Sequence, residues 1–322
     1  MELDEFLCRM YPLFSKRFLR RQVRDGNILV DGGRANPSQR VRCDEVVSLD
    51  VDEEDAEPFV PPGPELDLSV LYEDAHVVVV DKPTALAVEP DRWDETRASL
   101  VGALHALAGT TEGGPGRFRP RLVHRLDKGT SGAVLVAKTI EAERDLRAAF
   151  DAGTVRKQYL ALVEGEYPLE EGEEGLIELS IAPDRRRSGT MVVAESGKSA
   201  CTLVRVDQRF RGYTLLACEP RTGRTHQIRV HLAATGFPLA VDALYGRRKS
   251  LALSEIKAGY RPKPGRAESP LIDRLTLHAR SLEFDSLSEP GRRVTVEAQL
   301  PRDFARVLKQ LSKVRAPRSR RT

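Results

Sequence analysis

The central segment of this sequence is residues 121–132, Arg-Leu-Val-His-Arg-Leu-Asp-Lys-Gly-Thr-Ser-Gly, and the apolar run Ala133 to Ala137 follows it directly. An unbroken apolar run of this length predicts a buried β-strand. In the segment before it, Asp127 is the only acidic residue and stands close to His124 and Arg125. An Asp beside fixed cations stays ionised, because the charged form is then favoured. Such a carboxylate is suited to nucleophilic or electrostatic work at a sugar carbon.

Residues 124–132 also resemble a known motif. His-Arg-Leu-Asp-x-x-Thr-Ser-Gly is the signature loop of the RluA-type pseudouridine synthases, and this stretch matches it in register. The resemblance implies that Asp127 is the catalytic residue, that Arg125 displaces the target base from its stack, and that His124 lies at the substrate. The alternative is a charged turn in which Asp127 caps a helix or pairs with a cation, because short motifs often match by chance. The length of the match and two further blocks favour the catalytic interpretation.

A second block, residues 220–236, reads Pro-Arg-Thr-Gly-Arg-Thr-His-Gln-Ile-Arg-Val-His-Leu-Ala-Ala-Thr-Gly. It predicts a glycine turn that opens a helix, with Arg224, His226 and Arg229 at its start. Positive groups near a helix N-terminus are unfavourable unless an anion is bound there, so we expect either Asp127 or an RNA phosphate. The block resembles the family's Thr-Gly-Arg-x-His-Gln-Ile-Arg-Val-His motif. That resemblance implies that Arg229 pairs with Asp127, that Arg224 orders the loop or contacts RNA, and that His226 lies at the substrate.

A third block, residues 155–165, predicts a strand with two differently used faces, because its residues fall into two alternating sets. The sets are Tyr159, Ala161, Val163 and Gln158, Leu160, Leu162. The block resembles the family's Lys-x-Tyr-x-Ala-x-Val-x-Gly motif, which implies that Tyr159 lies against the target uracil and acts as the base at its C5. The alternative for a strand Tyr is core packing with a hydrogen-bonded hydroxyl. Residues 236–246 continue the family pattern and place Leu239 as an apolar wall for the base.

Metal and cofactor chemistry finds no support in these motifs. His226 and His231 are five residues apart, so on a helix they lie on different faces and cannot share a zinc ion. The chain also lacks a nucleotide-binding motif. We therefore expect no metal ion and no cofactor.

The N-terminal residues 1–50 predict a compact RNA-binding unit. Lys16 to Asp25 reads as a helix with Ser15 as its N-cap and Gly26 as its left-handed C-cap. Four arginines recur on it at three- and four-residue spacing and share one face: Arg17, Arg20, Arg21 and Arg24. Charge runs are usually solvated faces, but arginines without an interleaved acid favour phosphate binding. This helix and the strand and turn after it resemble the S4 RNA-binding domain.

A strand within residues 71–83 opens the main domain and ends at Pro83. A strand that closes on Lys-Pro resembles the family's first motif. The chain departs from the family at three positions. It has Ala85 where Gly is usual, Glu89 before Pro90 where His-Pro is usual, and Gly129 where an acid is often found. None of these departures removes a catalytic group.

The predicted fold class is α+β, with a small S4-like αα-β domain and a larger domain built on a mixed or antiparallel sheet with a central cleft. The predicted segments are the S4-like domain 1–50, an acidic and proline-rich linker 51–65, the catalytic domain 66–312 and a disordered basic tail 313–322. Within the catalytic domain we expect a flexible approach at 108–120 and a surface excursion at 166–190.

Composition sets wider limits. The net charge of +3 is too small to indicate a nucleic-acid partner by itself, so the evidence for one must come from the distribution of the charges. The four cysteines show no paired spacing and predict reduced thiols. The N-terminus lacks the features of a signal peptide and no apolar run approaches a membrane span, so we expect a cytoplasmic monomer without a membrane partner.

These observations together predict an RNA pseudouridine synthase that flips out its target uridine. Ribosomal RNA, with the large subunit favoured, is the expected partner, because an S4 domain accompanies many members that modify it. Transfer RNA is the other possibility. One alternative is a noncatalytic RNA-binding or ribosome-assembly factor on a synthase scaffold. A nuclease or glycosidase is disfavoured, because neither motif block contains a second carboxylate.

Overall fold

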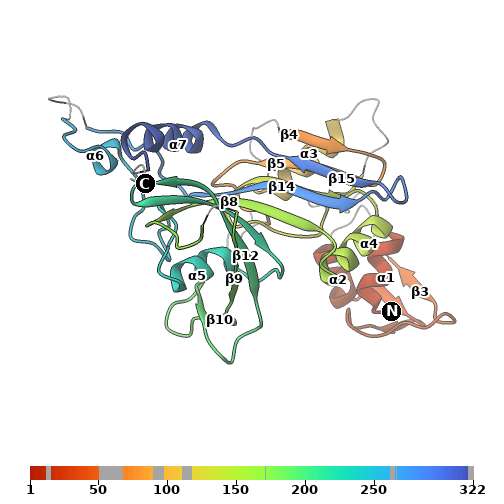
Figure 1. Ribbon diagram of the computed structural model, residues 1–322. Helices are drawn as coiled ribbons and strands as arrows, with labels where there is room; N and C mark the ends of the chain where they lie inside the picture. Colours follow the sequence, from red (N-terminus) through yellow and green to blue (C-terminus); the bar gives the residue numbers. More distant parts are fainter. Residues whose placement is uncertain are drawn as a thin grey trace. The chain divides into compact units, whose positions relative to one another are not determined.

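The computed structural model describes residues 1–11, 16–50, 68–89, 98–110, 118–170, 172–261, 265 and 267–317. The chain divides into two compact units, residues 1–66 with 90–121 and residues 67–89 with 122–322. Figure 1 shows their helices and strands along the chain. The predicted linker 51–65 and the predicted N-cap Ser15 lie outside the described residues.

The first unit begins with two helices and a small antiparallel sheet. Its elements are α1 (Leu3–Met10), α2 (Lys16–Asp25), β1 (Ile28–Val30), β2 (Gly33–Arg34) and β3 (Val47–Leu49), with strand order β2-β1-β3. The helices and the first strand share one buried cluster, made of Leu3, Leu7, Leu19, Val23 and Ile28. Helix α2 has the predicted bounds. Gly26 follows it with φ +87°, which confirms the predicted left-handed C-cap.

This unit also contains α3 (Leu100–Thr110), which the sequence analysis missed. Its sequence is apolar on nearly every side, so it carries no helical alternation that would identify it. The flexible approach predicted for residues 108–120 therefore overlaps the end of a helix. Residues 111–117 lie outside the described part of the chain.

The second unit is built on a ten-stranded sheet. Its main path runs β4-β5-β7-β14-β8-β13-β12-β9, with β15 on β14 and β6 on β7. The strands are β4 (Ser69–Glu73), β5 (Val77–Lys82), β6 (Arg121–Leu122), β7 (Ser131–Ala137), β8 (Arg156–Glu164), β9 (Glu174–Glu178), β12 (Cys201–Phe210), β13 (Tyr213–Pro220), β14 (Leu277–Asp285) and β15 (Arg293–Glu297). Strand β14 pairs with β7 in parallel and with β8 in antiparallel orientation, so the predicted mixed sheet is confirmed.

Helices cover the sheet on both sides. Leu160 and Leu162 of β8 pack with α6 (Leu253–Ile256) and α7 (Arg302–Val314), whereas Ala161 and Val163 pack with α5 (Gln227–Ala234). The two alternating sets predicted for this strand are therefore confirmed. Helix α4 (Ile140–Asp151) packs Ala142 and Leu146 against the part of the sheet formed by β5, β7 and β14.

Two segments are more regular than predicted. Residues 166–190, expected as a surface excursion, contain β9 at the end of the main sheet and β10 (Ile181–Pro183), which pairs with β11 (Met191–Val193). The basic tail, expected to be disordered from residue 313, begins as the last turn of α7. Beyond the helix, the Nε of Arg315 donates to the carbonyl of Ile256 at 2.6 Å. Within the described residues, no helix combines the length and apolar character needed to cross a bilayer.

Candidate active site

The loop that carries Asp127 is held by backbone contacts from three directions. Its own turn is closed by the N–H of Thr130, which donates to the carbonyl of Asp127 at 3.0 Å. The hydroxyl of Thr84 donates to the carbonyl of Gly129 at 3.1 Å, and the Nζ of Lys82 lies 3.3 Å from the carbonyl of Lys128. These contacts fix the loop ahead of β7, so the carboxylate of Asp127 projects from an ordered backbone.

Two of the departures from the family lie at this loop and beside it. Ala85 adopts φ +62°, the left-handed conformation that glycine favours. At Gly129 an added Cβ would lie 2.9 Å from the side chain of Leu275. A larger residue at this position therefore requires Leu275 to move.

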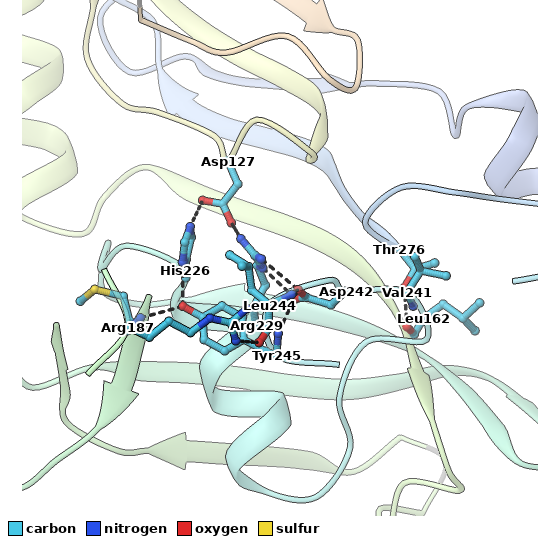
Figure 2. A network of polar contacts seen from close by, with 11 residues as sticks. Asp127, Leu162, Arg187, His226, Arg229, Val241, Asp242, Leu244, Tyr245 and Thr276 are labelled. Atoms are coloured by element: carbon cyan, nitrogen blue, oxygen red, sulfur yellow. Dashed lines mark hydrogen bonds and ion pairs between the residues drawn. The ribbon is translucent and has the colours of Figure 1, made fainter. Parts of the chain in front are cut away.

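Asp127 forms a close ion pair with Arg229. Its Oδ2 accepts from the Nη1 of Arg229 at 2.8 Å, across a sequence separation of 102 residues. The guanidinium is itself held by Asp242, whose two carboxylate oxygens accept from Nε at 2.8 Å and from Nη2 at 2.9 Å. The predicted contact between Asp127 and Arg229 is thus present, and Figure 2 shows the arrangement.

Burial makes this arrangement stiff. The side chain of Arg229 is 5% exposed and that of Asp242 is 1% exposed, whereas that of Asp127 is 23% exposed. Burial lowers the pKa of Arg229, but the hydrogen bonds and charges of Asp242 and Asp127 raise it by more, so the pKa lies above its usual value. Arg229 is therefore a permanent, positioned cation, and Asp127 is the member of the group that solvent or a substrate can reach.

Asp242 is placed by the segment that precedes it. The hydroxyl of Thr276 donates to the carbonyl of Leu162 in β8 at 2.9 Å and accepts from the N–H of Val241 at 3.2 Å. After Asp242 the chain turns, and the N–H of Leu244 donates to Oδ1 at 2.8 Å. The carboxylate thus ends a segment that is anchored to the sheet, as the close view in Figure 2 shows.

His226 lies on the other oxygen of Asp127. Its Nε2 is 3.9 Å from Oδ1 of Asp127, and its Nδ1 is 2.7 Å from the hydroxyl of Tyr245. Burial lowers the pKa of His226, and the charge of Asp127 works in the opposite direction. His226 therefore belongs to the same site as Asp127 and Arg229, as the sequence analysis predicted from its motif.

The surroundings of two further predicted residues, Tyr159 and Leu239, bear on their predicted roles. Burial raises the pKa of Tyr159, and the nearby charge of Asp127 adds to this rise. Its phenol therefore stays protonated at neutral pH. Leu239 is only 1% exposed and pairs with Val163 in an isolated bridge. The prediction that Leu239 forms a wall for the base is not supported, because the side chain is enclosed in the core.

His124 also has a different environment from the predicted one. Its Nε2 accepts from the N–H of Leu135 at 2.9 Å, and its ring packs on that of Phe150 with centroids 4.9 Å apart. Burial lowers the pKa of His124 to about 3. A neutral ring held in this way supports β7, so we assign His124 to the fold and not to the substrate.

The two remaining predicted residues of the second unit, Arg125 and Arg224, lie on its surface. Arg125 is 65% exposed, and its Nη1 pairs with Glu89 at 2.8 Å, so the atypical residue of the first motif contacts the arginine of the signature loop. Arg224 is exposed, and its Nε donates to the carbonyl of Ser199 at 3.0 Å. That contact agrees with the predicted role of Arg224 in ordering the loop.

The four arginines of α2 belong to the first unit. Arg17, Arg21 and Arg24 are exposed. Arg20 instead directs its Nε to Oδ2 of the buried Asp4 at 3.1 Å. Three of the four side chains therefore remain on the exposed face of the helix.

Asp242 and Tyr245 are the site residues that the sequence analysis did not assign. Both lie in the turn after Leu239, where no helical or strand periodicity marks them. Only folding brings Asp242 within reach of the motif arginine Arg229. The signal available in the sequence was the need of that arginine for an acidic partner elsewhere in the chain. Among the described residues, no group of three or more His, Cys, Asp or Glu side chains could hold a metal ion.

Comparisons with known proteins identify the family. Residues 76–234 match the family model described as RNA pseudouridylate synthase, and residues 1–47 match that of the S4 domain. The chain is 35% identical to an uncharacterised RNA pseudouridine synthase, YlyB, of Bacillus subtilis, over 97% of this chain and 94% of that protein. It is 36% identical to the ribosomal large subunit pseudouridine synthase D of Xanthomonas campestris, over 96% of this chain and 88% of that protein.

A solved structure supports the fold. Human RNA pseudouridylate synthase domain containing 4 superimposes with a TM-score of 0.56 at 24% identity, covering 76% of this chain and 92% of that one. At this identity the likeness concerns the fold alone. The sequence matches carry the family assignment: the chain belongs to the RluA-type RNA pseudouridine synthases, which are isomerases, and it has an S4 domain at its N-terminus.

Proposed function

We propose that this isomerase converts uridine to pseudouridine in ribosomal RNA of the large subunit and that Asp127 is its catalytic residue. The relative from Xanthomonas campestris that is named for the ribosomal large subunit aligns over nearly the whole chain. The observation that carries the catalytic assignment is the contact of Asp127 with a buried guanidinium that Asp242 already fixes. We place this reaction in the cytoplasm.

In the proposed reaction the target uridine leaves its stack, because an enzyme cannot reach the glycosidic bond of a stacked base. Arg125 exchanges its contact with Glu89 for the vacated place in the RNA. Asp127, held by Arg229, acts at the ribose as the bond between C1′ and N1 breaks. The free uracil turns and forms a bond between C1′ and C5. The proton on C5 leaves and N1 gains one, so the net change is an isomerisation.

Tyr159 has a narrower role in this scheme than the sequence analysis gave it. Because its pKa is raised, a phenolate is costly at neutral pH. We assign the neutral ring to contact with the uracil while the base turns. Arg17, Arg21 and Arg24 supply phosphate contacts from the S4 domain. Arg21 pairs with Asp25, but both side chains are exposed. Arg20 is left out of the set because it pairs with the buried Asp4.

The test is to map pseudouridine in ribosomal and transfer RNA from a strain that lacks the gene and is complemented with variants. Asp127→Asn keeps the size of the side chain and removes its charge, so it should abolish the modification while purified protein still binds the RNA. Asp207→Asn is the control, because that partly exposed carboxylate lies 3.9 Å from Arg280 and outside the site.

Loss of sites in ribosomal RNA that the wild type and Asp207→Asn restore would support both parts of the proposal. Sites lost in transfer RNA would overturn the choice of substrate. Full modification by Asp127→Asn would overturn the catalytic assignment. If no site were lost in the strain without the gene, a protein that acts by binding would be favoured instead.

A further inference from the structure

The turn after Leu239 places a tyrosine against three parts of the active site. The hydroxyl of Tyr245 lies 2.7 Å from the Nδ1 of His226 and accepts from the N–H of Met191 at 2.8 Å. The ring of Tyr245 lies under the guanidinium of Arg229, with the Cζ atom 4.9 Å from the ring centroid. Figure 2 shows this ring between His226 and Arg229.

These contacts favour one tautomer of His226. The N–H of Met191 occupies an acceptor site of the Tyr245 oxygen, so the hydroxyl proton is available to be donated. Its nearest acceptor is the Nδ1 of a neutral His226. When Nδ1 accepts, the proton of a neutral imidazole is on Nε2, the nitrogen that faces Asp127. The opposite tautomer would direct a lone pair at the carboxylate.

The backbone of His226 shows that its position is imposed by the structure. It adopts φ +55°, a left-handed conformation that is strained for a residue with a Cβ. Its surroundings also keep the ring neutral at neutral pH, because burial lowers the pKa of His226. The charged groups that face it are Asp127 and Asp242, which favour protonation, and Arg229, which opposes it.

We propose that Tyr245 is a positioning residue, whose hydroxyl holds His226 in the tautomer that presents Nε2–H to Oδ1 of Asp127. Arg229 then fixes one carboxylate oxygen and His226 restrains the other. A distance of 3.9 Å is longer than a hydrogen bond but leaves no room for a water molecule between Nε2 and Oδ1, so the two atoms face each other directly. This inference rests on the proposed role of Asp127.

Tyr245→Phe is the informative variant, because it keeps the ring under Arg229 and removes only the hydroxyl. We expect kcat to fall about three- to tenfold, the effect of one neutral hydrogen bond, with KM for RNA nearly unchanged. The loss should shrink as the pH falls towards the pKa of His226. A protonated imidazole carries Nε2–H whichever tautomer its neutral form prefers. Tyr72→Phe is the matched control, since Tyr72 lies on strand β4, outside the site, and its hydroxyl donates to Asp74.

A double-mutant cycle tests whether the hydroxyl acts through the histidine. His226→Asn suits the left-handed backbone, because Asn tolerates positive φ. In the His226→Asn background, Tyr245→Phe should cause little further loss of kcat. An equal loss in both backgrounds, or a loss that does not change with pH, would overturn the proposal.

The tautomer can also be observed without any turnover. The chain has six histidines, and ¹⁵N-labelling of their rings combined with His226→Asn identifies the signals of His226. The wild type should show the Nε2–H form at neutral pH, and Tyr245→Phe should show a mixture. A wild-type Nδ1–H form would overturn the proposal. If Asp127→Asn retained activity, the role of Asp127 would fail, while this spectrum would still report on Tyr245.

Discussion

At the scale of single residues, Lys82 is a charge enclosed beneath the loop that carries Asp127. Its side chain is fully buried, and its Nζ donates to the carbonyls of Pro83 and Leu86, each at 2.9 Å. A third carbonyl, that of Lys128, lies 3.3 Å away. Burial lowers the pKa of Lys82 to about 7, and the charge of Asp127 opposes this shift. The amine therefore titrates near neutrality in the folded protein.

This shift predicts how stability depends on pH. The pKa of Lys82 is about 7 in the folded chain, and that of an unfolded lysine is about 10.4. Between these values the unfolded state binds more protons, so the contribution of Lys82 to stability rises with pH and is lost as pH falls towards 7. Lys82→Met should remove this dependence. The free energy of unfolding of the wild type minus that of the variant should increase from about pH 7 to pH 9 in urea titrations.

The exposed Lys249 provides the comparison. Lys249→Met should leave the pH dependence of the wild type in place, because it does not change the buried amine of Lys82. A flat difference between wild type and Lys82→Met would show that the buried amine keeps its proton across this range.

Single residues also show where the sequence was informative about the site. Asp127 and Arg229 lie in two long motif blocks, and their contact could be predicted from the resemblance. Asp242 and Tyr245 could not, because a carboxylate and a phenol in a turn acquire meaning only from the atoms that folding places beside them. Leu239 illustrates the opposite case. Its place in the family pattern predicted contact with the base, but the pattern does not show that its side chain is only 1% exposed.

At the scale of secondary structure, the parallel contact between β7 and β14 joins the signature loop to the sheet. Gly132 pairs with Ala279 in this register, and His278 pairs with Ser131. The side chains of Ser131 and His278 also meet, with Oγ 3.0 Å from Nδ1. The start of β7, directly after the catalytic loop, thus depends on a close approach of two backbones.

Gly132 permits that approach. It has φ +117°, and an added Cβ would lie 2.1 Å from the carbonyl oxygen of Ala279. Gly132→Ala should therefore destabilise the protein by well over 2 kcal/mol, because a backbone clash adds to a strain of about 1–2 kcal/mol for an L-residue in this region. Chemical unfolding would measure the loss.

Gly153 gives the matched control, since it also has positive φ, +70°, but nothing lies within 4 Å of its added Cβ. Gly153→Ala should cost only the strain of about 1–2 kcal/mol. Equal losses for the two variants would show that the clash with Ala279 is relieved by a small shift of the strands.

Elements with periodic sequences were the predictable ones. Helix α2 and the two faces of β8 follow from the spacing of their side chains. Helix α3 is apolar nearly all round, and β9 and β10 are short strands in a segment rich in Glu and Gly, so neither periodicity nor composition identified them. Strand β9 pairs with β12, which is distant in the sequence.

At the scale of the whole molecule, RNA affinity should depend on the first unit and chemistry on the second. Replacing Arg17, Arg21 and Arg24 by Gln removes three exposed charges from α2. The slope of log affinity against log salt should become shallower by roughly two, since each phosphate contact contributes about 0.7–0.9. The turnover rate at saturating RNA should stay near that of the wild type. Filter binding at several salt concentrations would measure the slope.

A control variant with the same change of net charge tests whether the effect depends on where the arginines lie. Arg144, Arg292 and Arg302 are exposed in the second unit and lie outside the predicted RNA-binding helix. Replacing these three by Gln should alter the slope less than the changes in α2. If both sets of changes had the same effect, general electrostatics and not the S4 domain would account for the affinity.

The separation of 102 residues between Asp127 and Arg229 has a consequence for synthesis of the chain. The helices and strands of the S4 domain bury a core drawn entirely from residues 3–49, which leave the ribosome first. The ion pair of Asp127 and Arg229 cannot form until residue 229 has been made, and the second carboxylate follows at residue 242. The residues proposed to bind RNA, and the core beneath them, are therefore synthesised well before the proposed active site is complete.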